Sequence, residues 1–122
     1  MERTEKIQYL ATLITLIRSD GKIHPNEEKL LFSFAKGIGA GFLFLDQAET
    51  LATSSDFKVE YPCRSSDSLR LFEDMLLLAH ADAKLAAEEV SMIKDLLNHL
   101  QLSPSLVDRI KADVSGRYKS LT

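Results

Sequence analysis

The 122-residue chain lacks several features that mark whole classes of protein. Its single cysteine, Cys63, cannot form an internal disulfide, and a cysteine-rich metal cluster is excluded. The apolar stretch at residues 7–17 is interrupted by Gln8 and two threonines, so we expect neither a signal peptide nor a membrane span. The 15 basic and 18 acidic side chains leave a net charge of −3, which disfavours recognition of nucleic acid or anionic membranes by bulk charge. These features predict one cytoplasmic domain that spans residues 1–122.

Apolar residues at helical spacing indicate the elements of the first half. Leucine and isoleucine recur at intervals of three and four over residues 4–19, which is typical of an amphipathic helix. Pro25 suits the first turn of a second helix, and the glycines within residues 37–41 are expected to end that helix. Asp46 is predicted to cap a short third helix that ends near Thr53.

The second half repeats this pattern at an offset of 62 residues, so that Leu10 corresponds to Phe72 without a gap. The correspondence covers residues 7–40 and 69–102. Ser103 precedes a proline and predicts the start of a last helix. No segment alternates convincingly as a strand does. We therefore predict an all-α bundle of about six helices, built from two pseudo-repeated helical hairpins.

Acidic residues recur in the two linkers between the paired helices. They are Asp20, Glu27, Asp82 and Glu89, accompanied by Glu28 and Glu88. An EF-hand alignment fails, because Leu16 and Leu78 would fall on the first ligand position. Two interpretations remain: the carboxylates stabilise helix N-termini, or they form an acidic surface that binds a divalent cation, Ca²⁺, Mg²⁺, Mn²⁺ or Zn²⁺.

The same linkers carry a resemblance to a known family. The doubled pattern Asp-Gly-x-Ile-x-x-x-Glu resembles that of the TerB family of tellurite-resistance proteins, over about residues 7–102. The first copy is intact at residues 20–27, and the second, at residues 82–89, has Ala83 in place of glycine. The chain is also similar to the N-terminal domain of membrane-anchored DnaJ-like co-chaperones.

The resemblance implies an all-α fold and a bacterial cytoplasmic protein of the tellurite and stress response. It further implies divalent-metal binding through Asp20, Glu27, Asp82 and Glu89, and assembly with membrane-associated protein partners. It implies no catalytic residue.

Other reactive side chains give weaker signals. His24, His80 and His99 do not correspond between the two halves, which favours surface or capping roles over a zinc site. Cys63 lies beside Arg64 but has no recognisable base, so a nucleophilic role lacks support from the sequence.

Several aromatic residues lie off the predicted core stripes. They are Phe32, Phe42 and Phe44, with Leu45 beside them. These residues either pack in the core or form an exposed patch that docks a partner helix or a second copy of the chain. The basic residues of the last helix are interpreted as a solvated face, with an acidic partner or lipid headgroups as the alternative.

The leading hypothesis is a non-enzymatic interaction module whose acidic linkers bind a partner or a cation. A homodimerising structural domain is the first alternative. A metal-dependent hydrolase that uses the same carboxylates is the second.

Overall fold

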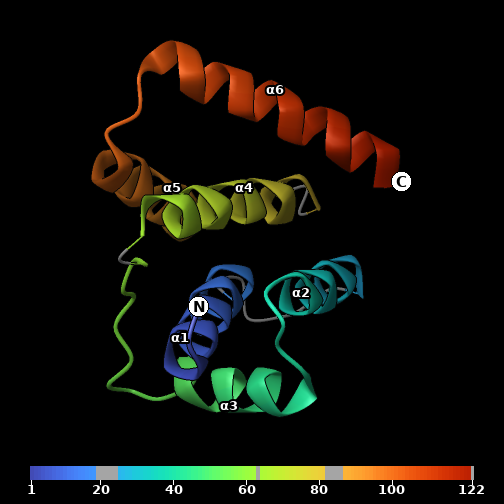
Figure 1. Cartoon of the computed structure of the whole chain (residues 1–122), viewed down its shortest axis with the longest axis vertical. Coiled ribbons are helices and arrows are strands. Elements are labelled where there is room, and N and C mark those ends of the chain that lie inside the picture. Colours follow the sequence, from blue (N-terminus) through green and yellow to red (C-terminus); the bar gives the residue numbers. More distant parts are fainter. Residues whose placement is uncertain (19–24, 63, 82–86, 122) are drawn as a thin grey trace. The chain divides into compact units, whose positions relative to one another are not determined.

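The computed structural model describes residues 1–18, 25–62, 64–81 and 87–121, with the side chains of residues 65, 81, 87–89, 120 and 121 outside that description (Figure 1). Within these ranges the chain forms six helices and no strand: α1 (Arg3–Ile17), α2 (Pro25–Gly37), α3 (Phe42–Ala52), α4 (Ser65–Ala81), α5 (Ala87–Leu100) and α6 (Pro104–Leu121). The predicted all-α class is confirmed. The chain divides into two compact units, unit 1 (Met1–Pro62) and unit 2 (Cys63–Thr122).

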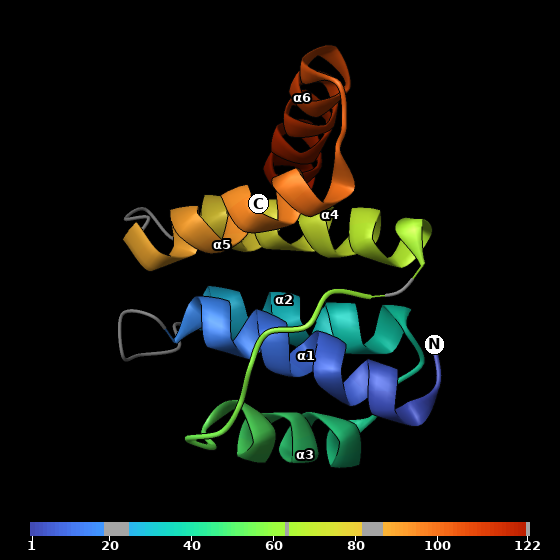
Figure 2. The same ribbon diagram turned by 90° about the vertical axis from the view of Figure 1, so that its left-hand side faces the viewer.

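In unit 1, α1 packs against both α2 and α3, with α3 along one side of it (Figure 2). Its buried residues cover more of the helix than the predicted stripe: Tyr9, Leu10, Ala11, Thr12, Leu13, Ile14, Leu16 and Ile17. Thr12 is accommodated because its hydroxyl donates to the Gln8 carbonyl, 2.9 Å away, within the same helix. A helix that is apolar on nearly every side is typical of a central position.

The turn between α2 and α3 depends on Gly39. Its φ of +74° is the left-handed conformation that glycine adopts without strain. The amide of Ala40 donates to the Ala35 carbonyl at 2.8 Å, and the Gly39 amide donates to the Lys36 carbonyl at 3.1 Å, which closes the end of α2. Lys6 of α1 donates to the Gly39 carbonyl at 3.3 Å and holds the turn against α1. The axes of α2 and α3 consequently bend by 118°.

The start of α3 corrects one expectation. Asp46 was expected to cap this helix, but α3 begins at Phe42 and its N-cap is Gly41. The Gly41 carbonyl accepts the amide of Leu45 at 3.1 Å, so the helix is already hydrogen-bonded before Asp46 is reached. After α3, an irregular segment at residues 53–62 passes alongside α1, where Gln8 donates to the Lys58 carbonyl at 3.2 Å (Figure 2).

In unit 2, α4 packs against both α5 and α6. The buried residues come from all three helices and are chiefly Leu71, Phe72, Met75, Leu77, Leu78, Leu96 and Val114. The predicted start of the last helix is confirmed: α6 begins at Pro104, and the Ser103 hydroxyl accepts the amide of Leu106 at 3.3 Å.

Among the described residues, no single helix is long and apolar enough to cross a membrane, whereas α2 and α3 taken together have the length and composition of a broken span.

Candidate functional site

The acidic residues predicted from the linkers do not share one environment. Glu27 is the third residue of α2 and is 1% exposed, whereas its neighbour Glu28 is exposed. Glu27 occupies the helix start expected for a capping carboxylate, where backbone amides and the helix dipole favour negative charge. Its burial means that it contributes to the interior of unit 1 and not to an acidic surface.

The remaining predicted ligands cannot be placed. Asp20 and Asp82 lie outside the described residues, as do the side chains of Glu88 and Glu89. Within the described part of the chain, no group of three His, Cys, Asp or Glu residues could hold a metal ion.

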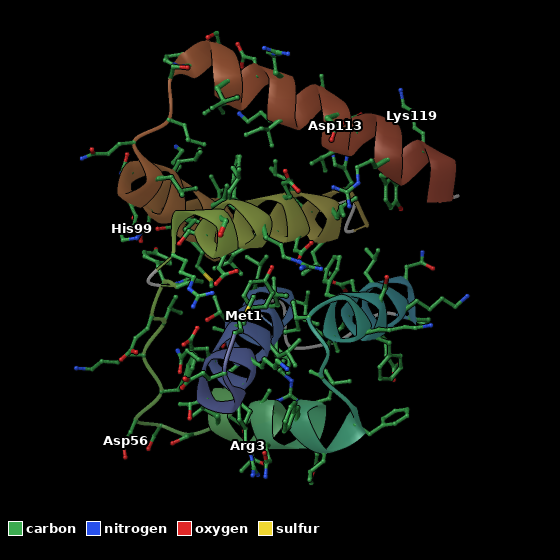
Figure 3. All side chains as sticks on the ribbon, in the orientation of Figure 1. Met1, Arg3, Asp56, His99, Asp113 and Lys119 are labelled. Atoms are coloured by element: carbon green, nitrogen blue, oxygen red, sulfur yellow. The ribbon has the colours of Figure 1, made fainter. Side chains whose placement is uncertain are left out.

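Histidine and cysteine give no shared site in the described residues. His80 stacks on Tyr118 of α6 with ring centroids 5.7 Å apart and planes inclined by 19°, so it joins α4 to α6. His24 and Cys63 lie outside the described residues. The basic residues of α6 behave largely as a solvated face, because Arg109, Lys111 and Lys119 are exposed (Figure 3).

The surface feature of unit 1 that sequence patterns did not locate is a groove between α2 and α3. Its volume is about 310 Å³, and it is lined by Ile14, Glu28, Leu31, Phe32, Phe42, Leu45, Asp46 and Glu49. A second hollow of about 170 Å³ adjoins it, shares Phe32, Phe42 and Leu45, and adds Ala35, Lys36, Ala40 and Gly41. We call the two hollows together the α2–α3 groove. Its larger part lies at the small end of the roughly 300–1,000 Å³ range of ligand pockets, which suits apolar side chains better than a large cofactor.

Two aromatic rings form the exposed wall of the groove. Phe32 of α2 is 41% exposed and Phe42 of α3 is 79% exposed. Their ring centroids lie 5.6 Å apart with the planes inclined by 65°, an edge-to-face pair. Adjacent aromatic side chains that remain in water are typical of binding surfaces, since burying them releases apolar area.

The apolar run at the start of α3 divides between surface and interior. Phe42 and Leu43 are exposed, at 79% and 64%, whereas Phe44 is half-buried. Phe44 lies below the cationic groups of Arg3 and Lys6, at 5.7 and 5.9 Å from its ring centroid. Arg3 also donates to the Gln47 side chain at 3.3 Å, so the start of α1 is tied to α3 (Figure 3). Of the two expected phenylalanines of this run, Phe42 therefore faces the groove and Phe44 supports the packing of α1.

Acidic side chains surround one end of the groove. Glu28 comes from α2, and Asp46 and Glu49 come from α3; all three are exposed. Glu49 pairs with Arg18 at 2.9 Å, and both side chains are partly exposed. Within the described residues, Glu28 and Asp46 form no ion pair. Sequence reasoning identified Glu28 only as a companion metal ligand and missed Asp46 and Glu49, because their proximity depends on the bend between α2 and α3.

Comparisons with protein-family models, curated proteins and solved structures gave no match for this chain. The functional argument therefore depends on the geometry of the two units and on the residues themselves.

Proposed function

We propose that the chain is a non-enzymatic interaction module that docks an apolar helix of a protein partner in the α2–α3 groove. The observation that carries the proposal is the exposed Phe32–Phe42 pair on the wall of an apolar hollow. Helix-in-groove recognition places apolar anchors at helical spacing into such a surface, and aromatic side chains frequently supply much of the binding energy.

We further propose that units 1 and 2 are duplicated three-helix units of the TerB type. The proposal is supported by the helix starts, because α4, α5 and α6 begin 62 residues after α1, α2 and α3. It is also supported by two left-handed residues at the same offset, Gly39 (φ +74°) and Gln101 (φ +53°), each just beyond the second helix of its unit. Equivalent backbone bonds precede the first helix interior in each unit: Lys6 N to Glu2 O, and Ser68 N to Arg64 O.

This duplication extends beyond the hairpins detected in the sequence. The amides of Leu45 and Val107, also 62 residues apart, each bond to the carbonyl four residues earlier at 3.1 Å, at the start of the third helix. The buried polar residues Thr12 and Asp74 follow the same spacing on the first helix. Each unit accordingly comprises a hairpin and the third helix that packs on it.

The resemblance to TerB proteins supports a cellular setting for the module. We propose a bacterial stress or tellurite response, in the cytoplasm, with a membrane-associated protein as the partner that supplies the helix. Divalent-cation binding by Asp20 and Asp82 belongs to the same proposal. Calorimetric titration of the metal-stripped protein with Ca²⁺, Mg²⁺, Mn²⁺ and Zn²⁺ should give heat that the Asp20→Ala, Asp82→Ala variant loses, and silence for every ion would overturn the cation part.

Docking in the groove can be tested before the natural partner is known. Helical peptides would be selected against the whole chain from a display library and mapped by amide chemical shifts. We expect the selected peptides to perturb the groove and Phe42→Ser to weaken them by about tenfold or more, since a central aromatic anchor is lost. Leu43→Ser is the matched control, because Leu43 is the adjacent exposed residue and does not line the groove. Equal affinity for wild type and Phe42→Ser would show that the groove is not the docking site.

A further inference from the structure

We infer that the helix bound in the α2–α3 groove carries basic side chains at one end of its apolar face. The inference rests on the proposed docking function and specifies the chemistry of the partner. Its basis is the distribution of charge along the groove, which is acidic at one end only.

The line of side chains on α2 gives the groove this polarity. Glu28, Phe32 and Lys36 are four residues apart, so they lie along one face of the helix. Glu28 lines the larger hollow, and Lys36 lines the smaller one beside Gly41. The aromatic pair therefore has an acidic group on one side and a cationic group on the other.

The side chains of α3 reinforce the acidic end. Asp46 and Glu49 line the larger hollow together with Glu28. Arg18 compensates Glu49 at 2.9 Å, whereas Glu28 and Asp46 have no ion-pair partner within the described residues. Lysine or arginine on a docked helix would meet these two carboxylates beside an apolar surface that excludes water, where charge complementarity contributes to specificity.

Two other occupants fit this charge less well. A second copy of the chain, bound groove to groove about a two-fold axis, would bring Glu28, Asp46 and Glu49 against the same residues of its partner. An anionic lipid surface would be repelled by the same carboxylates. The acidic end thus favours a basic protein helix over either alternative.

The test compares two fluorescent peptides with the same leucine face, one carrying lysine and arginine at one end and the other carrying glutamate there. Anisotropy titrations with the whole chain should show the basic peptide binding about tenfold more tightly at low salt, and the ratio should fall at 1 M salt. The Glu28→Lys, Asp46→Lys variant should reverse the preference.

The matched control is Asp56→Lys, Glu60→Lys, which changes the net charge equally. Both residues are exposed in the segment after α3 and do not line the groove; Figure 3 shows Asp56 beyond the end of that helix. This variant should keep the preference for the basic peptide.

The outcomes separate the inference from the proposed function. If both peptides bind equally and Phe42→Ser abolishes both, docking stands and the basic partner is wrong. If neither peptide binds at millimolar concentration, both are wrong. Self-association lost in Phe42→Ser, measured by sedimentation, would assign the groove to a second copy of the chain. Co-sedimentation with phosphatidylcholine or phosphatidylglycerol vesicles, again lost in Phe42→Ser, would assign it to a lipid surface.

Discussion

Unit 1 and unit 2 differ most in the residues carried by their second and third helices. At the 62-residue offset, Phe32 corresponds to Lys94 and Glu49 to Lys111, and all but Phe32 among these four are long charged side chains. Pro104 occupies the position equivalent to Phe42. An aromatic pair beside acidic groups is therefore not a requirement of the three-helix unit. Its restriction to unit 1 indicates that this face was shaped by something other than helix packing.

The first helices, in contrast, are alike in what they bury. Leu13 of α1 and Met75 of α4 are both fully buried, and so are Leu10 and Phe72. In each unit this helix packs against the other two. Apolar volume at the centre is conserved between the units although the residue types differ, which is the usual tolerance of a packed core.

The largest expected effect tests that likeness. Leu13→Ala and Met75→Ala should each lower the free energy of unfolding by about 2–5 kcal/mol, because each leaves a cavity at a fully buried position. Urea denaturation would measure both, with exposed Leu43→Ala as the control. A loss under about 1 kcal/mol for only one of the two would break the proposed equivalence of the central helices.

Buried and exposed acids at the start of α2 give the next effect. Glu27→Gln should destabilise the chain by about 1–3 kcal/mol, since a buried carboxylate and its partners are disturbed, whereas exposed Glu28→Gln should stay within about 0.5 kcal/mol. Glu89→Gln should match Glu27→Gln if the units are duplicates. Chemical denaturation of the three variants decides the point, and equal small losses at Glu27 and Glu28 would contradict an interior role for Glu27.

The two left-handed turns should respond with opposite signs. Gly39→Ala introduces a Cβ at φ +74° and should cost about 1 kcal/mol, whereas Gln101→Gly removes the strain of a side chain at φ +53° and should stabilise unit 2 by up to about 1 kcal/mol. Thermal unfolding of both variants is the measurement. Stabilisation by Gly39→Ala would show that the turns are not equivalent.

The smallest effect concerns an ion pair in each unit with its charges exchanged. Arg18, at the end of α1, pairs with Glu49 of α3 at 2.9 Å; in unit 2, Glu73 of α4 pairs with Arg117 of α6 at 3.4 Å. All four side chains are partly exposed, so double-mutant cycles with alanine should give coupling free energies of about 0.2–1 kcal/mol that decrease in salt. Coupling above about 2 kcal/mol would indicate that the pair is more desolvated than its exposure implies.

Much of the fold could be predicted from the sequence because helix signals are local. Apolar spacing located the helices, and Pro25, Gly39 and Ser103 marked ends that the structure confirms. The start of α3 was wrong because Asp46 is a typical capping residue, whereas Gly41 acts through its backbone alone. A bare backbone carbonyl leaves no residue-type signal.

The groove could be predicted only in part. Phe32 was recognised as lying off the core stripe, and Phe42 as belonging to a run too apolar for a solvated connection. Which of Phe42 and Phe44 remains in water depends on Arg3 and Lys6 of α1, whose approach to the Phe44 ring is a tertiary contact. The acidic end likewise requires the 118° bend, which no residue pattern specifies.

The central helix of each unit precedes both of its packing partners in the chain, and all three lie within about sixty consecutive residues. During synthesis, unit 1 therefore has every helix that it needs as soon as Pro62 has left the ribosome, while unit 2 is still being translated. Such local wiring favours rapid folding, because little loop entropy is lost before the helices meet. The nascent chain could accordingly present a finished α2–α3 surface before the rest of its own sequence exists.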